Sequence, residues 1–388
     1  MMVGWRKCKL RDVIASNVQS INKDYPHKTI QYLDTGSITC GKIESYQEIM
    51  LENTPSRAKR LVREHDIIYS TVRPIQRHYG FIVNPPANLV VSTGFSVIKT
   101  NRELAEPLFI YNFLTSNEIV EVLDVIADGS TSAYPSLKPS DIENLDILLP
   151  PLPKQKAIAS VLSSLDDKID LLHRQNKTLE AMAQTLFRQW FVEEAQEDWQ
   201  DGKFPDEFDY VMGASPPGES YNETGVGIPM FQGNADFEFR FPKRRIFTTD
   251  PKKFAEKYDT LVSVRAPVGA QNMANEKCCI GRGVAAFRYK RNNGYYTYTY
   301  FKMKSLMKEI QSFNDTGTVF GSISKADFEA FEIIIPPSEL VDRCQAEIKP
   351  IDDKVITNII QIRTLEKLRD TLLPKLMSGE VRVEYDAN

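Results

Sequence analysis

The chain has 388 residues, of which 42% are hydrophobic and 26% charged, and its net charge is −4 at pH 7. This length suffices for two or more domains with separate cores, and the composition is typical of globular proteins. No apolar run approaches the roughly 18 residues of a membrane helix and no signal-peptide core is present, so we expect a cytoplasmic protein. Five cysteines without framework spacing and four histidines without ligand spacing argue against disulfides and a metal site.

The first half of the chain, 1–153, is a mixed and strand-rich segment. Asn88–Lys99 is rich in β-branched residues and is interrupted by a Ser-Thr-Gly turn, so it predicts two strands. A helix is predicted over about Leu108–Val125. A short apolar run then predicts a strand that ends at Pro150 and Pro151, because prolines stop a strand and are tolerated in the first turn of a helix.

A long helix is predicted over 154–192, where apolar residues recur alternately every four and three residues. This period of 3.5 residues marks the seam of a coiled coil. We assign helix pairing to seam residues of this helix and of a second one at 338–378: Leu165, Ile169, Leu172, Asn176 and Leu179 in the first, and Ile351, Val355, Asn358, Ile362 and Leu365 in the second. One asparagine in each seam costs stability but can fix the register. The alternative is that each helix only covers its own domain.

The second half, 193–337, begins with an acidic connector at 193–209 and is otherwise rich in strands. Phe287–Phe301 alternates aromatic and polar residues around Asn293-Gly294, which predicts a β-hairpin with a two-residue turn. A helix is predicted over about Tyr300–Phe313. The second long helix at 338–378 follows, and the C-terminal tail is 379–388.

An internal repeat organises these elements. Ser136–Phe191 aligns without a gap on Ser322–Met377 at a constant offset of 186 residues, with identical residues that include Asp141, Pro150, Pro151, Asp166, Asp167, Lys168, Gln175 and Glu180. Such self-similarity indicates a duplication rather than a solenoid, which needs three or more copies. We therefore predict an α+β fold with two strand-rich domains, separated by two long helices in an antiparallel coiled coil with pseudo-two-fold symmetry. This symmetry suggests a bipartite ligand.

Basic residues concentrate in equivalent parts of the two halves. Arg240–Lys308 contains 16 Lys and Arg against 4 Asp and Glu, and Thr54–Arg102 contains 8 against 2, whereas 193–209 contains 1 against 8. Clusters of this kind are the electrostatic signature of nucleic-acid binding. The alternative is that they are ordinary solvated faces.

Two pairs of corresponding loops supply candidate contacts to phosphates and base edges. Asp66–Pro74 and Asp259–Pro267 each read as a strand that leads to an arginine, and each is followed downstream by a Gly/Ser/Thr loop with one aromatic residue. Arginine forks and small hydroxyls suit such contacts. The candidates are Arg57, Lys59, Arg60, Arg73, Arg77, Ser130, Thr131, Ser132 and Tyr134 in the first half, and Lys243, Arg244, Arg245, Arg265, Gln271, Thr316, Thr318 and Phe320 in the second. Alternatively, Arg73 and Arg265 each pair with a carboxylate and the Gly/Ser/Thr loops are plain turns.

Nearly the whole chain resembles one known family. The resemblance rests on the following motifs: Trp5–Asp12 at the start, Leu149–Lys156 (LPPLPKQK) leading into Asp166–Ile169, the matching Pro336-Pro337 with Asp352–Val355, Gly213–Pro217 followed by Gly225–Pro229, and the terminal Leu372–Val383. Each motif alone is weak, but their order and duplication are specific. The chain looks like the specificity subunit of a type I restriction–modification enzyme.

This resemblance implies two target recognition domains that each read half of a split DNA sequence, and two helices that set the spacing and dock two methyltransferase subunits. The chain itself would be no enzyme and bind no cofactor or metal. S-adenosylmethionine, ATP and Mg would belong to the methyltransferase and restriction (motor–nuclease) subunits. In agreement, the sequence has no GxxxxGK[ST] or GxGxxG loop. The alternatives are a coiled-coil scaffold that binds protein, or a DNA-modifying enzyme in its own right.

Overall fold

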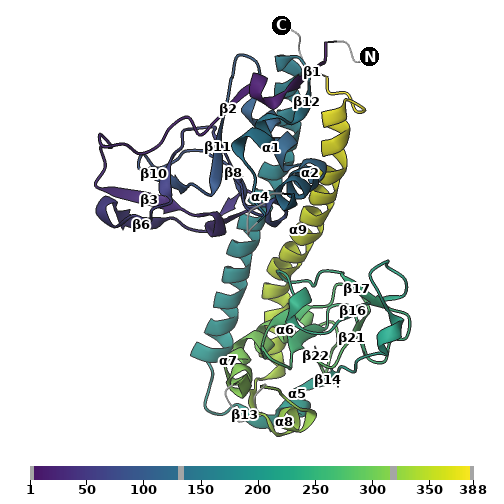
Figure 1. Cartoon of the computed structure of the whole chain (residues 1–388). Helices are drawn as coiled ribbons and strands as arrows, with labels where there is room; N and C mark the ends of the chain where they lie inside the picture. Colours follow the sequence, from purple (N-terminus) through teal and green to yellow (C-terminus); the bar gives the residue numbers. More distant parts are fainter. Residues whose placement is uncertain (1–3, 130–134, 315–320, 385–388) are drawn as a thin grey trace. The chain divides into compact units, whose positions relative to one another are not determined.

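The computed structural model describes residues 4–129, 135–314 and 321–384. The chain divides into two compact units: unit 1 is Met1–Asp170 with Arg363–Asn388, and unit 2 is Leu171–Ile362. Both units contain helices and sheets (Figure 1), so the chain has the mixed composition that the sequence predicts. Among the described residues, no helix is both long enough and apolar enough to span a membrane.

Unit 1 contains two four-stranded sheets and two strand pairs. The first sheet has the order β2-β11-β8-β9 and the second the order β6-β3-β10-β7, while β1 pairs with β12 and β4 with β5. The strands are β1 (Arg6–Lys9), β2 (Ile14–Ser16), β3 (Thr29–Leu33), β4 (Ile38–Thr39), β5 (Lys42–Ile43), β6 (Gln47–Met50), β7 (Ala58–Leu61), β8 (Ile67–Ser70), β9 (Tyr79–Phe81), β10 (Leu89–Ser92), β11 (Phe95–Thr100) and β12 (Asp146–Leu149). The predicted strands of Asn88–Lys99 are β10 and β11, and the turn sends them into different sheets.

Unit 2 repeats this topology. Its sheets have the orders β14-β22-β19-β20 and β15-β17-β16-β21-β18, and β13 pairs with β23 as β1 pairs with β12. In each unit the second sheet contains one parallel pair, β3 with β10 and β16 with β21. The strands are β13 (Gln200–Lys203), β14 (Phe208–Met212), β15 (Tyr221–Asn222), β16 (Ile228–Phe231), β17 (Ile246–Thr248), β18 (Phe254–Ala255), β19 (Thr260–Ser263), β20 (Gln271–Met273), β21 (Cys278–Ile280), β22 (Val284–Tyr289) and β23 (Glu332–Ile335).

The structural repeat is therefore longer than the one visible in the sequence. The acidic segment 193–209 contains β13, the short helix α5 (Phe204–Glu207) and the start of β14. The Lys203 amide donates to Asp206 at 2.7 Å, as the Lys9 amide donates to Asp12 at 3.0 Å in unit 1. The segment that opens unit 2 is thus built like the segment that opens unit 1, although the two sequences differ.

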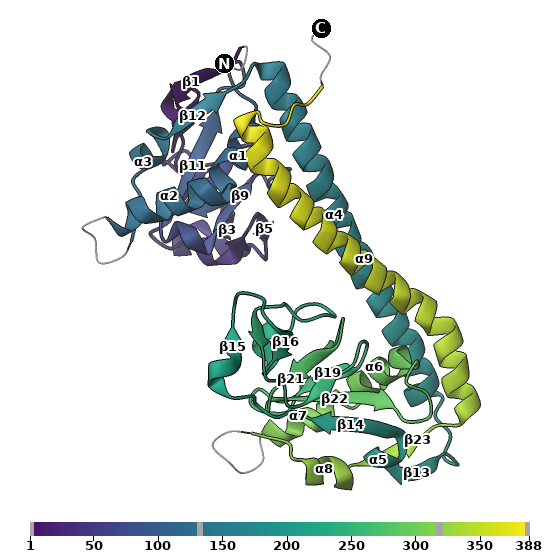
Figure 2. The same cartoon turned by 90° about the vertical axis from the view of Figure 1, so that its right-hand side faces the viewer.

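Two long helices, α4 (Leu152–Arg188) and α9 (Ser338–Ser378), each contribute residues to both units. Within each unit their segments lie side by side (Figure 1 and Figure 2). The helix α9 continues through Pro350 and Pro374, although an interior proline removes a backbone hydrogen bond and costs about 3 kcal/mol. Burial of its seam offsets this cost, since most helical stability in proteins comes from packing.

Shorter helices cover the sheets. The helix predicted near Leu108–Val125 is divided at Ser116 into α1 (Pro107–Thr115) and α2 (Asn117–Asp128), and α3 (Pro139–Glu143) follows. In unit 2 the corresponding helices are α6 (Tyr296–Ser305), α7 (Met307–Gln311) and α8 (Lys325–Ala330). Proline at the start of α1 and α3 suits the first helical turn, where no amide partner is needed.

The predicted hairpin at Phe287–Phe301 is wrong. The segment forms β22, a turn at Asn293-Gly294, and then α6. The partners of β22 are β14 and β19, which lie far from it in sequence. Seven consecutive residues of α6, from Thr297 to Met303, are buried, so the helix has no polar face to produce a period of 3.6. The alternating Tyr and Thr residues therefore give the two-residue period that is typical of a strand, although the segment is a helix.

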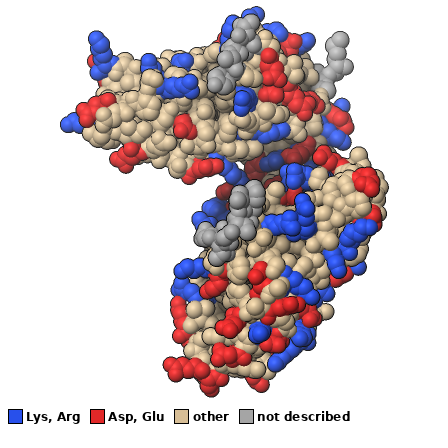
Figure 3. Space-filling model, turned by 60° about the horizontal axis from the view of Figure 1, so that its bottom comes forward, with Lys and Arg blue, Asp and Glu red and all other residues tan. Residues whose placement is uncertain are grey.

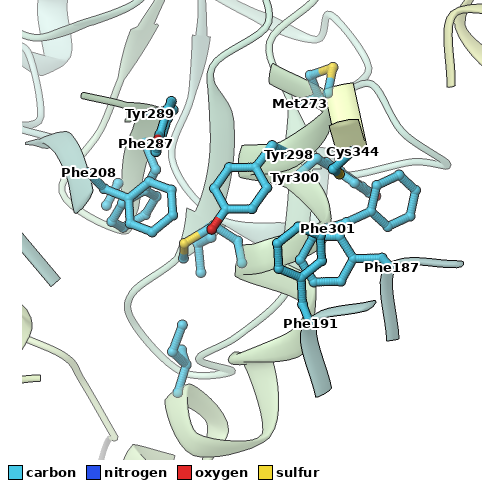
Figure 4. Packing of buried hydrophobic residues seen from close by; sticks show 14 of the residues in the cluster. Phe187, Phe191, Phe208, Met273, Phe287, Tyr289, Tyr298, Tyr300, Phe301 and Cys344 are labelled. Atoms are coloured by element: carbon cyan, nitrogen blue, oxygen red, sulfur yellow. The ribbon is translucent and has the colours of Figure 1, made fainter. Parts of the chain in front are cut away.

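The main core of unit 2 is aromatic (Figure 4). Phe187 lies in the last turn of α4, and Phe191 lies in the π-helical turn Gln189–Glu193 that follows it. Both pack near Tyr298 and Phe301 of α6, with ring centroids 4.4 to 6.1 Å apart. This core continues onto the seam of α9 through Cys344 and Ile348. The sheet of unit 2 is therefore joined to the helix segments of the same unit by one hydrophobic core.

Candidate nucleic-acid interface

In unit 1 the end of strand β8 lies beside the chain that follows residues 130–134. The Leu137 amide donates to the Thr71 carbonyl at 2.7 Å, and the Arg73 amide donates to the Pro135 carbonyl at 3.3 Å. Arg73 has a left-handed backbone, with φ +47°. The described end of the second loop, residues 135–137, therefore lies beside the first loop.

Unit 2 contains the same arrangement at the end of β19. The Ile323 amide donates to the Val264 carbonyl at 3.0 Å, and Arg265 forms an isolated bridge with Ser322. In unit 1 the equivalent bridge joins Val72 to Ser136. The structural counterpart of Arg265 is thus Val72, and Arg73 lies one residue further along the chain.

A buried serine stabilises each strand end. The Ser70 hydroxyl accepts from the Val72 amide at 3.2 Å and donates to the Val72 carbonyl at 3.0 Å. The Ser263 hydroxyl accepts from the Ala270 amide and donates to the Pro267 carbonyl, both at 2.8 Å. These side-chain bonds hold the backbone that carries Arg73 and Arg265.

Five candidate cations are exposed, and within the described ranges their side chains make no ion pair or hydrogen bond: Arg57, Lys59, Arg73, Lys243 and Arg265. Arg57 and Lys59 flank the start of β7, and Lys243 precedes β17. Their charges are available to an anionic ligand, because no described carboxylate neutralises them at close range.

The other described candidates are bonded to protein groups or partly buried. Arg77 donates to Asn117 at 2.9 Å, Arg244 pairs with Glu276 at 2.5 Å, and Arg245 pairs with Asp236 at 2.9 Å. Gln271 donates to the Tyr300 carbonyl at 2.7 Å, and Arg60 is half-buried in β7. Arg244 and Arg245 therefore pair with carboxylates, whereas Arg73 and Arg265 have no carboxylate partner among the described residues. Seven candidates lie outside the described residues: Ser130, Thr131, Ser132, Tyr134, Thr316, Thr318 and Phe320.

Charged side chains of both signs are present on the face drawn in Figure 3. On the face drawn in Figure 3, Lys and Arg are interspersed with Asp and Glu in both units, without a continuous patch of one sign. On this face an anionic partner would meet individual exposed cations rather than a broad basic surface.

The ten seam residues of the two long helices are all buried or half-buried. In unit 2 the Asn358 amide donates to the Asn176 side-chain oxygen at 2.9 Å, and both side chains are almost inaccessible to solvent. In unit 1 Arg369 of α9 pairs with Asp166 of α4 at 2.9 Å. Both polar contacts join α4 to α9.

The sequence did not single out Arg240, which is 2% exposed. Its guanidinium pairs with Asp352 of α9 at 2.8 Å and with Glu180 of α4. The repeat gave one indication of this cluster, since Asp352 and Glu180 recur as Asp166 and Glu366. A carboxylate beside an apolar seam in both copies indicates that it pairs with a cation. The sequence around it does not identify that cation.

A family model described as the type I restriction modification DNA specificity domain matches residues 2–181 and 196–369. The chain belongs to this family. The two matched ranges contain the strand ends that carry Arg73 and Arg265, and most of both long helices.

Individual members of the specificity family match over nearly the whole chain. The type I restriction enzyme HindI specificity subunit of Haemophilus influenzae is 25% identical and is aligned over 98% of this chain and 100% of its own length. The HsdS subunit of Thermoanaerobacter tengcongensis is 31% identical over 98% of each chain, with a TM-score of 0.43. The S subunit of the type I system of M. genitalium is 17% identical, covers 97% of this chain and 96% of its own, and has a TM-score of 0.60, which concerns the fold alone.

Proposed function

We propose that this chain is the DNA sequence-specificity subunit of a type I restriction–modification enzyme. The observation that carries the proposal is the duplicated strand end: within a chain of this family, each unit presents an exposed arginine beside a second loop. A duplicated reading site suits a DNA target with two specific halves. In this role the chain recognises DNA, and catalysis belongs to other subunits.

Each unit would read one half of the target. Arg73 in unit 1 and Arg265 in unit 2 are exposed, and an arginine fork can donate two hydrogen bonds to a guanine edge or a phosphate. Arg57, Lys59 and Lys243 would contact phosphates, which position a protein on the duplex without reading the sequence. Arg60, Arg77, Arg244, Arg245 and Gln271 would instead support the loops, since they are partly buried or already bonded to protein groups.

The two long helices would form an antiparallel coiled coil that sets the distance between the half-sites and docks two methyltransferase subunits. Polar contacts between α4 and α9 in both units, and the full or partial burial of all ten seam residues, support this part of the proposal. S-adenosylmethionine would be bound by the methyltransferase subunits. ATP and Mg would be used by the restriction subunits.

Affinity for DNA would depend on assembly. The chain is acidic overall, with a net charge of −4, and its exposed cations are interspersed with carboxylates. Neutralisation of phosphates supplies much of the affinity in protein–DNA complexes. We therefore expect weak DNA binding by the isolated chain and tight binding once the methyltransferase subunits contribute their own basic surfaces.

The test is co-expression with the methyltransferase subunit encoded beside this chain, followed by single-molecule sequencing of host DNA for modified adenines. The expected result is one interrupted motif, with two short specific blocks around a fixed gap. A stable complex without new methylation would favour the scaffold alternative. Binding of S-adenosylmethionine by the isolated chain would favour an enzyme in its own right, and the absence of any complex would contradict the docking role.

A further inference from the structure

A buried cluster of four charges connects the sheet-bearing part of unit 2 to the helix segments of the same unit. Arg240, in the loop between β16 and β17, pairs with Asp352 of α9 at 2.8 Å and with Glu180 of α4. Lys304 of α6 also pairs with Glu180, at 2.6 Å. Two cations therefore face two carboxylates that come from different helices.

Further contacts hold the Arg240 side chain in one position. Its guanidinium lies 3.6 Å from the centre of the Tyr300 ring, which is a close cation–π geometry. Asp352 also accepts from the Thr297 hydroxyl at 2.9 Å, so α6 contributes to both ends of the cluster. Burial raises the pKa of the Asp352 carboxyl, and the charge of Arg240 opposes this effect.

This cluster contributes little net free energy to the stability of the fold, because its charges must be removed from water. Removing charges from water costs several kcal/mol per ion, and apolar residues of similar volume often stabilise as well or better. The Arg240 Nε and Nη1 atoms are buried without a hydrogen-bond partner in the described part of the chain, which adds to the cost. What a buried, directional cluster supplies more readily than stability is one defined geometry.

The backbone of Arg240 extends this geometry to the candidate interface. The Met273 amide of β20 donates to the Arg240 carbonyl at 2.8 Å. The strand β20 pairs with β19, whose end carries Arg265. Lys243, an exposed candidate cation, lies three residues after Arg240. A shift of Arg240 relative to α4 and α9 would thus move both candidate contacts.

In unit 1 the carboxylate that corresponds to Asp352 in the repeat, Asp166, has a different partner. Asp166 pairs with Arg369, which belongs to α9 itself and has a side chain 35% exposed. That pair joins helix to helix, and Arg369 also pairs with its neighbour Asp370 at 2.9 Å. The Arg369 pair is therefore a natural control for the Arg240 cluster, because it contains an equivalent carboxylate without a link to a sheet.

We infer that Arg240 is a positioning residue that fixes the recognition surface of unit 2 on the α4 and α9 segments of that unit. This inference rests on the proposed function. In this role the cluster keeps the surface that reads one half-site at a defined position along the helices. Arg240 itself does not contact DNA.

The first experiment needs no DNA. Hydrogen exchange of the full-length chain is compared between wild type, Arg240→Met, Arg240→Lys and Arg369→Met. Arg240→Met is expected to raise amide exchange at least tenfold in 237–245 and 271–273 while the sheet β14-β22-β19 stays protected. Arg240→Lys keeps the charge but loses the planar guanidinium over the Tyr300 ring, so it should give a smaller increase, and Arg369→Met should give none in these segments. Unchanged exchange in Arg240→Met would overturn the inference.

The second experiment uses the methyltransferase complex and the motif found for the wild type. Methylation rates are measured on duplexes with the native gap and with gaps one base pair shorter or longer. We expect Arg240→Met to reduce about tenfold the ratio between the methylation rate on the native gap and the rate on altered gaps. Sequence discrimination should be relaxed in one half-site only. Arg240→Lys should restore part of the ratio. A merely structural role would lower all rates together and leave the ratio unchanged, which would overturn the positioning role.

The two experiments separate the possible failures. If the wild-type complex methylates no interrupted motif, the proposed function fails, while the exchange data still decide whether Arg240 holds the sheet of unit 2 on the helices. If Arg240→Met does not fold, Arg240→Lys and Arg369→Met decide the comparison. Equal gap ratios in those two variants would count against the inference.

Discussion

Arg73 and Arg265 follow buried strands, yet their side chains are exposed and unpaired within the described ranges. The backbone that carries them is fixed by a serine hydroxyl and by bridges to Ser136 and Ser322. An exposed guanidinium on a fixed backbone loses little freedom when it binds, which favours specific contacts. Because Arg265 occupies the position of Val72, the two arginines need not contact equivalent atoms of the two half-sites.

Replacement of either arginine should impair one half-site. We expect Arg73→Ala and Arg265→Ala each to slow methylation of the full target by roughly 5- to 150-fold, the equivalent of about 1 to 3 kcal/mol for a good base contact, and to leave assembly intact. The measurement is the methylation rate on duplexes with single substitutions in each half. Arg343→Ala, which removes a charge that is paired with Glu347, is the control. A wild-type rate in either variant would make that arginine structural or merely solvated.

Asp66 and Asp259 have the same local role in different surroundings. Each accepts a 2.8 Å hydrogen bond from the amide three residues earlier, Arg63 or Glu256, and burial raises the pKa of both carboxyls. Only Asp259 also has a buried ion pair, with Arg288. A carboxyl with a raised pKa binds a proton more readily in the folded state, so the stability that it confers is lost as pH rises from about 4 through its folded pKa.

Asp66→Asn should therefore remove this loss, because asparagine can accept the same amide bond without a charge. We expect the free energy of unfolding of Asp66→Asn to equal or exceed that of wild type at pH 7, with the difference growing from pH 4 upward. The same sign applies to Asp259→Asn, but the loss of the Arg288 ion pair offsets part of the gain, so we expect a smaller increase at pH 7 than for Asp66→Asn. Urea unfolding from pH 4 to 7 measures both, and equal stabilities of the two variants would contradict the argument.

Asn176 and Asn358 are the polar residues at one level of the helix seam in unit 2. Their single hydrogen bond leaves the Asn176 Nδ2 and the Asn358 Oδ1 without partners in the described structure. At the offset of the repeat, Asn176 corresponds to Ile362 and Asn358 to Leu172. Two copies of the same helix would place each asparagine against an apolar residue, so the pair favours α4 with α9.

Replacing one asparagine of the pair should lower the free energy of unfolding, whereas replacing both with apolar residues should change it little. Asn176→Ile alone leaves the buried Asn358 with only the long contact from its Nδ2 to the Gln175 side-chain oxygen at 3.5 Å, and we expect a loss of about 1 to 3 kcal/mol in the free energy of unfolding. Asn176→Ile with Asn358→Leu reproduces the apolar pair of the repeat and should recover most of that loss or exceed wild type. A double-mutant cycle from urea unfolding measures the coupling. Additive effects of the two substitutions would show that the pair is not an interacting unit.

For the whole molecule, the proposed function makes the length of α4 and α9 a determinant of the DNA target. One heptad inserted into both helices at repeat-equivalent positions keeps the seam in register and lengthens each by about 10 Å. That length corresponds to roughly 3 base pairs at 3.4 Å each. The native gap should then no longer be methylated well, because the half-sites would be presented further apart.

The comparison uses sequencing of modified adenines in hosts that express each variant. A heptad inserted into α4 alone puts its seam out of step with α9, so we expect loss of the complex or of methylation. An insertion of the same seven residues into the loop at 223–226, between β15 and β16 and outside the helices, is the control for added length. An unchanged gap in the double insertion would exclude the helices as a ruler.

The sequence by itself determined the properties that local patterns carry. A period of 3.5 residues predicts a long helix wherever it stands, and α4 and α9 are present. Turn residues predicted the division between β10 and β11 for the same reason, and the repeat with its Pro-Pro and Asp-Asp-Lys motifs led to the family that the comparisons show.

The tertiary structure decided what depends on distant partners. Thr297–Met303 resembles a strand until its burial on every side is known, and β22 takes its partners from β14 and β19. The correspondence of Arg265 with Val72 comes from bridges to a separate loop. Arg240 pairs with Glu180 and Asp352, which are separated from it by 60 and 112 positions in the sequence. Such choices are set by packing and desolvation over the whole unit, and a local pattern of residues does not contain them.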